Sequence, residues 1–83
     1  MDAPEIARHS AIDAVDFFRP MIGGCTMIFI DALPRPLRDV TLPQIAAFEL
    51  YTRRTQAPPQ FQNPRLDCGS LVVWTRSSLS LQP

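Results

Sequence analysis

The 83-residue sequence contains no lysine, one histidine, two cysteines and three glycines. Its eight basic residues are all arginine, and eight acidic residues balance them to a formal net charge of zero. Because nucleic-acid binding requires a basic surface, this balance argues against a nucleic-acid partner. Two cysteines are too few for a closed zinc site with four ligands, and they do not form the CxxC pair of a redox motif.

Long apolar runs are also missing. The longest uncharged apolar segment runs from Pro20 to Ile30, about eleven residues, which is too short to span a bilayer. The N-terminal residues include Asp2 and Glu5 and lack the basic start and apolar stretch of a secretory signal. The sequence as written predicts a soluble chain without an export signal, or the trimmed or fragmentary part of an exported protein.

The composition is that of a folded domain. Hydrophobic residues make up 46% of the chain and charged residues 19%, which excludes a disordered polar chain. A chain of this length forms one domain and buries roughly 60% of its unfolded surface, enough for one small core. Nine prolines predict rigid, extended connections.

Capping patterns predict helices in two places. The patterns at 2–5 and 10–13 favour one helix over 3–18, or two shorter helices, ending before Pro20. A third pattern, Thr-Leu-Pro-Gln at 41–44, predicts a short helix of one or two turns.

Three segments have the patterns of β-strands. Residues 26–30 are continuously apolar, which is typical of a strand covered on both faces. Residues 47–53 alternate, with Phe48 and Leu50 on one face of the strand. Residues 69–76 are rich in β-branched and aromatic side chains.

The order of these elements predicts an α+β domain over residues 1–76. We expect a small sheet of three to four strands, an N-terminal helix on one face and one short crossover helix. Residues 54–67 contain three prolines and form an expected loop held by Phe61, and 77–83 form an expected flexible tail.

The residues offer little for catalysis. His9 lies four residues before Asp13, a spacing typical of a solvated helical pair. A Cys-His nucleophile would need His9 beside Cys25 or Cys68, whereas a cysteine in a turn before an apolar strand is typically structural. Glycine-rich phosphate loops and metal-ligand spacings are missing. We therefore expect no enzyme activity, no cofactor and no metal.

The two cysteines permit two states. Cys25 and Cys68 are either separate buried thiols or one disulfide that closes a loop of about forty residues. The chain-entropy model gives such a bridge about 4 kcal/mol of stabilisation. The missing signal sequence by itself favours free thiols.

Four segments, taken in order, resemble the plug domain of TonB-dependent outer-membrane receptors, in particular the short cysteine-containing variety found beside carboxypeptidase-regulatory-like modules. Residues 29–31 (Phe-Ile-Asp) are similar to a strand ending in hydrophobic-Asp-Gly, and 45–51 to a strand of the type Ile-Glu-x-Ile-Glu-Val-Tyr. Residues 69–76 are similar to Gly-Val-Ile-x-Ile-x-Thr-Arg, and 11–20 to the upstream helix. Ala32 stands where the family has glycine, and no TonB-box-like pentapeptide leads the sequence.

The resemblance implies a non-enzymatic binding or occlusion module of the periplasm or outer membrane. Its partner would be a β-barrel or other envelope protein, and transport by this chain alone is not expected because no barrel sequence follows. The resemblance also implies a Cys25–Cys68 disulfide, since cysteine-containing members carry cysteines at both places. Loops 54–67 and 33–40 would face the ligand or partner, through residues that include Arg53, Arg54, Arg65 and Phe61.

The alternative is a small cytoplasmic interaction or adaptor protein that pairs through a strand edge. Oxidised cysteines in an envelope fraction would favour the plug-like module, and reduced thiols in the cytosol would favour the adaptor.

Overall fold

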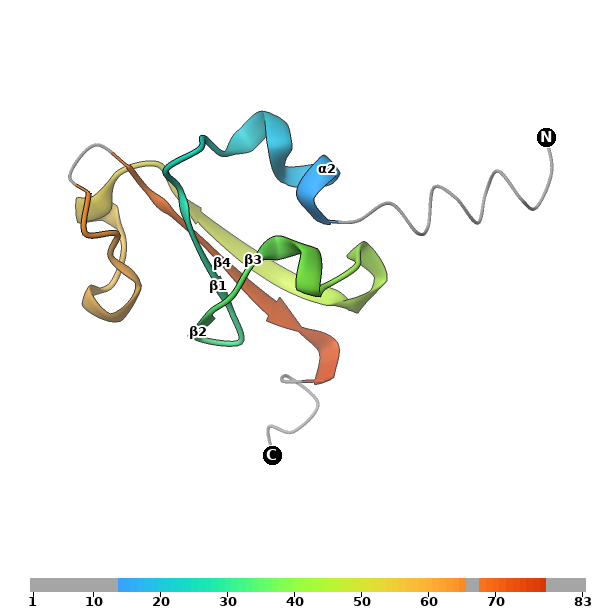
Figure 1. The fold of residues 1–83 in the computed structure, drawn as a ribbon. Coiled ribbons are helices and arrows are strands. Elements are labelled where there is room, and N and C mark those ends of the chain that lie inside the picture. The colour runs from blue at the N-terminus through green and yellow to red at the C-terminus, as the bar shows by residue number, and fades with distance from the viewer. Residues whose placement is uncertain (1–13, 66–67, 78–83) are drawn as a thin grey trace, which may run out of the picture.

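The computed structural model describes residues 14–65 and 68–77. Four strands form one mixed sheet in the order β2-β1-β4-β3 (Figure 1). The strands are β1 (Met27–Ile30), β2 (Leu33–Pro34), β3 (Ile45–Tyr51) and β4 (Ser70–Thr75). β1 and β4 run parallel, whereas β2 is antiparallel to β1 and β3 is antiparallel to β4. The expected α+β class is confirmed.

Helix α2 (Ala14–Phe18) covers one face of the sheet. Ala14 and Phe18 are fully buried, and they pack with Ile30 of β1 and Leu71 and Val73 of β4. Burying a side chain such as that of Phe18 contributes roughly 1.5–3 kcal/mol, so this contact fixes the short helix on the sheet.

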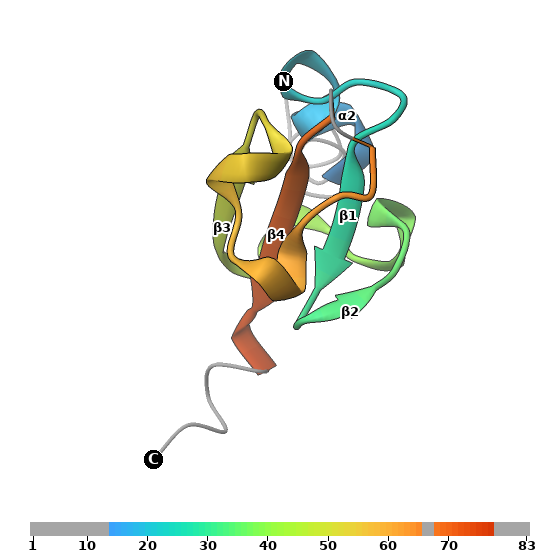
Figure 2. The ribbon, with the colours of Figure 1, turned by 90° about the vertical axis from the view of Figure 1, so that its left-hand side faces the viewer.

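The connection from β3 to β4 covers the opposite face. It contains the 3-10 turns Arg54–Gln56 and Pro59–Phe61 and folds back over β1 and β4 (Figure 2). Phe61 packs edge-on against Phe29, with ring centroids 5.1 Å apart. Both faces of β1 are therefore covered, as its continuously apolar sequence predicts.

A two-residue turn joins β1 to β2. Asp31 and Ala32 have φ values of 52° and 74°, the positive values that a type I′ hairpin turn requires. β2 is not predicted from the sequence, because the turn carries no glycine and β2 contains a proline. The side chain of Asp31 also accepts hydrogen bonds from Thr75, at 2.8 Å from the backbone N and 2.7 Å from Oγ1, which ties the end of β1 to the end of β4.

Several predicted boundaries differ from the observed ones. The α-helix ends before Pro20 as expected, but the chain continues as a 3-10 turn over Arg19–Met21. The capping pattern at 41–44 forms only the 3-10 turn Leu42–Gln44, in which the Thr41 backbone N donates to Gln44 Oε1 at 2.8 Å. A further 3-10 turn spans Leu37–Asp39. The start of the expected N-terminal helix and residues 78–83 of the expected tail lie outside the described residues.

Candidate partner-binding surfaces

The two cysteines join the starts of the two central strands. β1 and β4 are parallel with Met27 opposite Ser70, so Cys25 and Cys68, each two residues earlier, have the same offset of 43 residues. They form a disulfide with a Cα–Cα distance of 5.9 Å, inside the range of about 4.4–6.8 Å that a bridge requires. The disulfide implied by the resemblance is confirmed, and the free-thiol alternative does not describe this structure.

Asn63 attaches the loop to the disulfide end of the sheet. Its Nδ2 donates to the carbonyl oxygens of Cys25, at 2.8 Å, and Gly69, at 2.9 Å. Its Oδ1 accepts from the backbone N of Arg65 at 3.0 Å. The sequence does not predict this role, because an asparagine in a proline-rich loop is typically exposed to solvent, whereas Asn63 is buried.

The expected partner-facing residues have different environments. Arg53 and Arg65 are exposed, and Arg54 is half-buried with an Nε atom that has no hydrogen-bond partner in the described part of the chain. Phe61 is only 6% exposed and belongs to the core, so the expectation that its ring faces a partner is corrected. Its apolar ring is buried against Phe29 because β1 leaves that face of the sheet to be covered.

The two expected partner-facing loops also lie apart. Leu37 and Val40 of the first loop pack in the core on the α2 side of the sheet. Ala57 and Phe61 of the second loop pack in the core on the other side. Each loop therefore covers its own face of the sheet and contributes to packing there.

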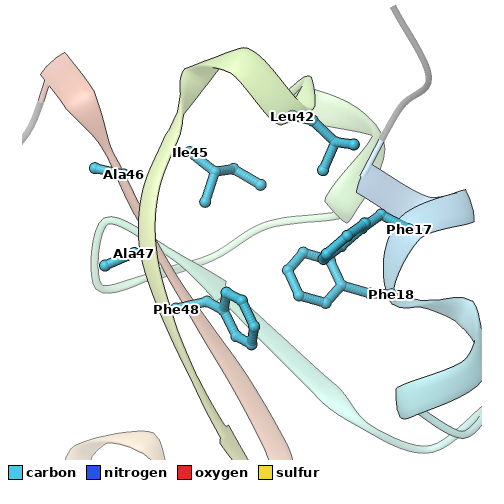
Figure 3. A pocket seen from close by; sticks show the side chains of 7 residues that line it. All are labelled: Phe17, Phe18, Leu42, Ile45, Ala46, Ala47 and Phe48. Carbon is cyan, nitrogen blue, oxygen red and sulfur yellow. The ribbon is translucent and has the colours of Figure 1, made fainter. Parts of the chain in front are cut away.

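An apolar hollow of about 480 Å³ lies between α2 and β3. Figure 3 shows Phe17 and Phe18 from α2 turned toward Ile45 and Phe48 from β3, with Leu42 closing one side. Phe18 and Phe48 meet edge to face, with ring centroids 4.8 Å apart. Phe17 and Phe48 remain 43% and 41% exposed, respectively, so this hollow places aromatic surface in contact with solvent.

The opposite side of β3 carries a polar pair. The Tyr51 hydroxyl donates a hydrogen bond to the Glu49 carboxylate. This hydrogen bond, followed by burial and the negative charge of Glu49, raises the pKa of Tyr51 above its ordinary 10.0. β3 therefore presents an aromatic face toward α2 and a hydrogen-bonding face away from it.

Chemistry that needs a free thiol or a metal lacks its groups in the described residues. Both sulfur atoms are held in the disulfide, which leaves no thiol nucleophile. Over 14–65 and 68–77, no three His, Cys, Asp or Glu side chains are placed to hold a metal ion. His9, the expected partner of such a nucleophile, lies outside these ranges.

Comparisons of the chain with protein-family models, with curated proteins and with solved structures found no match. Within the described residues, no helix has both the length and the apolar character needed to cross a membrane.

Proposed function

We propose that this chain is a non-enzymatic plug-like domain of a TonB-dependent outer-membrane receptor system, acting as a binding or occlusion module. The observation that carries the proposal is the disulfide between Cys25 and Cys68. Its two cysteines lie shortly before two of the segments on which the resemblance rests, 29–31 and 69–76, at the places where the cysteine-containing plug domains have cysteines. Disulfides persist in the oxidising compartments where such receptors are found.

The turn at the end of β1 gives further support. The resemblance places a glycine after Asp31, and Ala32 adopts a φ of 74°, a backbone conformation that glycine adopts without strain. Ala32 therefore has a backbone conformation that suits the glycine of a hydrophobic-Asp-Gly turn.

The mechanism that we propose is steric and recognitional. A sheet with packing on both faces, and with a disulfide that joins the starts of its two central strands, is a rigid body that can fill a lumen. Arg53 and Arg65 are exposed, and guanidinium groups bind carboxylates and phosphates through two parallel hydrogen bonds. We expect these arginines to contact anionic groups of the ligand or partner.

Site-specific photocrosslinking in the native host tests this function. A photoreactive residue replaces Arg65 in the full chain, and the same residue replaces Asp16 as a control, since both positions are exposed but Asp16 lies on α2. The proposal predicts a crosslink from position 65 to an outer-membrane protein, and a weaker one or none from position 16. Crosslinks confined to cytosolic proteins would contradict it.

The adaptor function has one observation in its favour. β3 is an edge strand of the sheet and exposes Phe48 beside the apolar hollow, which is the arrangement used by proteins that add a partner strand. A crosslink from β3 to a cytosolic protein, in cells that hold the two cysteines reduced, would favour this function over the plug-like one.

A further inference from the structure

The two edges of the sheet are protected to different degrees. β2 has only two residues and ends in Pro34, followed by a second proline two residues on, and short proline-containing edges resist pairing with another chain. β3 has seven residues without proline, lysine or arginine, and Glu49 is its single charged residue. Of the two edges, β3 is the one able to accept another strand.

The hydrogen-bond pattern shows which backbone groups of β3 face outward. Met27 N donates to Gly69 O and Asp31 N donates to Val73 O, so the odd-numbered residues of β4 bond to β1. The backbone groups of Ser70, Val72 and Trp74 therefore face β3, where their partners are Tyr51, Glu49 and Ala47, respectively.

Because these directions alternate along a strand, the N–H and C=O groups of Phe48 and Leu50 point away from β4. Within the described residues no strand lies beyond β3, so these groups form an open edge. The side chain of Phe48 lies on the α2 face of the same edge.

We propose that β3 pairs antiparallel with β3 of a second copy of this chain, about a two-fold axis at Phe48. Antiparallel pairing of identical strands is self-complementary, and it joins two four-stranded sheets into one. This inference goes beyond the proposed function and does not rest on it.

Charge excludes one register. A two-fold axis at Glu49 would place two carboxylates directly opposite each other, and like charges in that position are destabilising. An axis at Phe48 places Glu49 opposite the uncharged Ala47 of the second copy instead. The zero net charge of the chain adds no long-range repulsion between the two copies.

The Phe48 register also uses the exposed aromatic surface. The outward backbone groups of Phe48 can exchange two hydrogen bonds with those of the second copy's Phe48. The two rings then lie opposite each other on the α2 face, beside the two hollows, and cross-strand aromatic pairs are favourable. Phe17 of each copy, which is exposed in the single chain, lies next to this contact.

Sedimentation velocity of the full, oxidised chain over micromolar to millimolar concentration tests the pairing. The wild type is expected to show a reversible monomer–dimer equilibrium. Phe48→Lys and Phe48→Glu should each be monomeric over the same range, because each places two like charges at the axis. An equimolar mixture of the two variants should restore the dimer, because opposite charges then meet at the axis.

A second pair of variants leaves Phe48 and the other aromatic side chains unchanged. Ala47 is exposed on the other face of β3 and faces Glu49 of the second copy in this register. Ala47→Lys should tighten the dimer and Ala47→Glu should weaken it, each by about tenfold in the dissociation constant. The effect is this large because the two-fold axis creates two contacts between position 47 of one copy and Glu49 of the other. Leu33→Lys, at a 59% exposed residue on the other edge, is the matched control and should leave the equilibrium unchanged.

A wild-type chain that stays monomeric at millimolar concentration would overturn the proposal. Pairing of β3 with a different protein, and never with a second copy of this chain, would overturn it too. A dimer that is insensitive to all four substitutions in β3 would overturn it as well, because its interface would lie elsewhere. Retention of the Cys25–Cys68 bond and of the near-ultraviolet circular dichroism shows that each variant is folded.

Discussion

Ala32 occupies a backbone conformation that alanine seldom adopts. Its φ of 74° follows the φ of 52° at Asp31, so two consecutive residues with a Cβ atom lie in the left-handed region. This conformation costs an L-residue roughly 1–2 kcal/mol. The turn is held in place by its surroundings, chiefly by the two hydrogen bonds from Thr75 to the Asp31 carboxylate.

Ala32→Gly is therefore expected to stabilise the protein by about 1 kcal/mol, because glycine adopts a positive φ without strain, a gain partly offset by its greater freedom in the unfolded chain. Urea unfolding of the oxidised protein measures this as a higher midpoint at an unchanged slope. Ala47→Gly is the control in extended backbone and should lose about 0.5–1 kcal/mol. A loss of stability in Ala32→Gly would show that the turn has a different backbone conformation.

Tyr51 reports on the outer face of β3, and it is the only tyrosine in the chain. Its raised pKa means that the folded chain holds the phenol proton more strongly than the unfolded chain does. The resulting stability is fully present below pH 10 and is lost as the pH rises through the folded pKa. Ultraviolet absorbance of the phenolate should titrate above 10.0 in the folded protein.

In Glu49→Gln, the same titration should move back toward the ordinary value, because the carboxylate that accepts the hydrogen bond is gone. Asp39→Asn removes an exposed carboxylate from another part of the fold and is the matched control. Identical titration curves for the wild type and Glu49→Gln would contradict the hydrogen bond.

At the scale of the elements, the sequence predicts the three longer strands and leaves out what tertiary contacts create. Expected strands at 26–30, 47–53 and 69–76 are observed at Met27–Ile30, Ile45–Tyr51 and Ser70–Thr75. Their apolar content and alternation are local properties, so local patterns are sufficient. β2 is two residues long and exists only because the Asp31–Ala32 turn returns the chain to β1, which no local pattern encodes.

For a related reason, the sequence does not predict which surface of the sheet the loop between β3 and β4 covers. Its prolines and polar residues correctly predict an irregular connection, but they do not show which surface it covers. The sequence feature that predicts this covering layer lies in β1, because a strand that is apolar on both faces requires a covering layer on each face. Phe61 and Ala57 supply that layer, and so Phe61 is part of the core.

Gly69 sets how closely β3 approaches β4. A Cβ atom at this position would lie 1.7 Å from the carbonyl oxygen of Tyr51 and 2.8 Å from the carbonyl carbon of Thr52. Because both atoms belong to the backbone, Gly69→Ala must push the two strands apart, and we expect a loss of about 3 kcal/mol or more.

Gly24→Ala is the matched control, since a Cβ there would meet nothing within 4 Å, and its stability should stay within about 0.5 kcal/mol of wild type. Thermal unfolding of both variants by circular dichroism makes the comparison. Equal melting temperatures for the two variants would show that β3 and β4 are not in this close contact.

At the scale of the whole molecule, the Cys25–Cys68 disulfide stabilises a domain that has only a small hydrophobic core. The cores on the two faces of the sheet are small, and a chain of this size buries only roughly 60% of its unfolded surface. Domains of this kind have a free energy of unfolding of about 5–15 kcal/mol. The disulfide closes a loop across 43 residues and contributes about 4 kcal/mol of that in the chain-entropy model.

The double variant Cys25→Ala/Cys68→Ala should therefore lose about 4 kcal/mol of unfolding free energy, measured by urea denaturation against the oxidised wild type. Reduced wild type should lose a similar amount, which separates the effect of the bond from that of the substituted side chains. A loss below about 1 kcal/mol in both would show that the fold does not depend on this bond.

The most direct test of the plug-like function is the state of these two cysteines in the native host. Intact mass spectrometry follows alkylation under denaturing conditions, with and without reductant, on protein from separated envelope and cytosolic fractions. The account predicts a chain in the envelope fraction that takes up no alkylating groups until reductant is added. A chain in the cytosol that takes up two groups without reductant would contradict it, and the adaptor function would then be the better description.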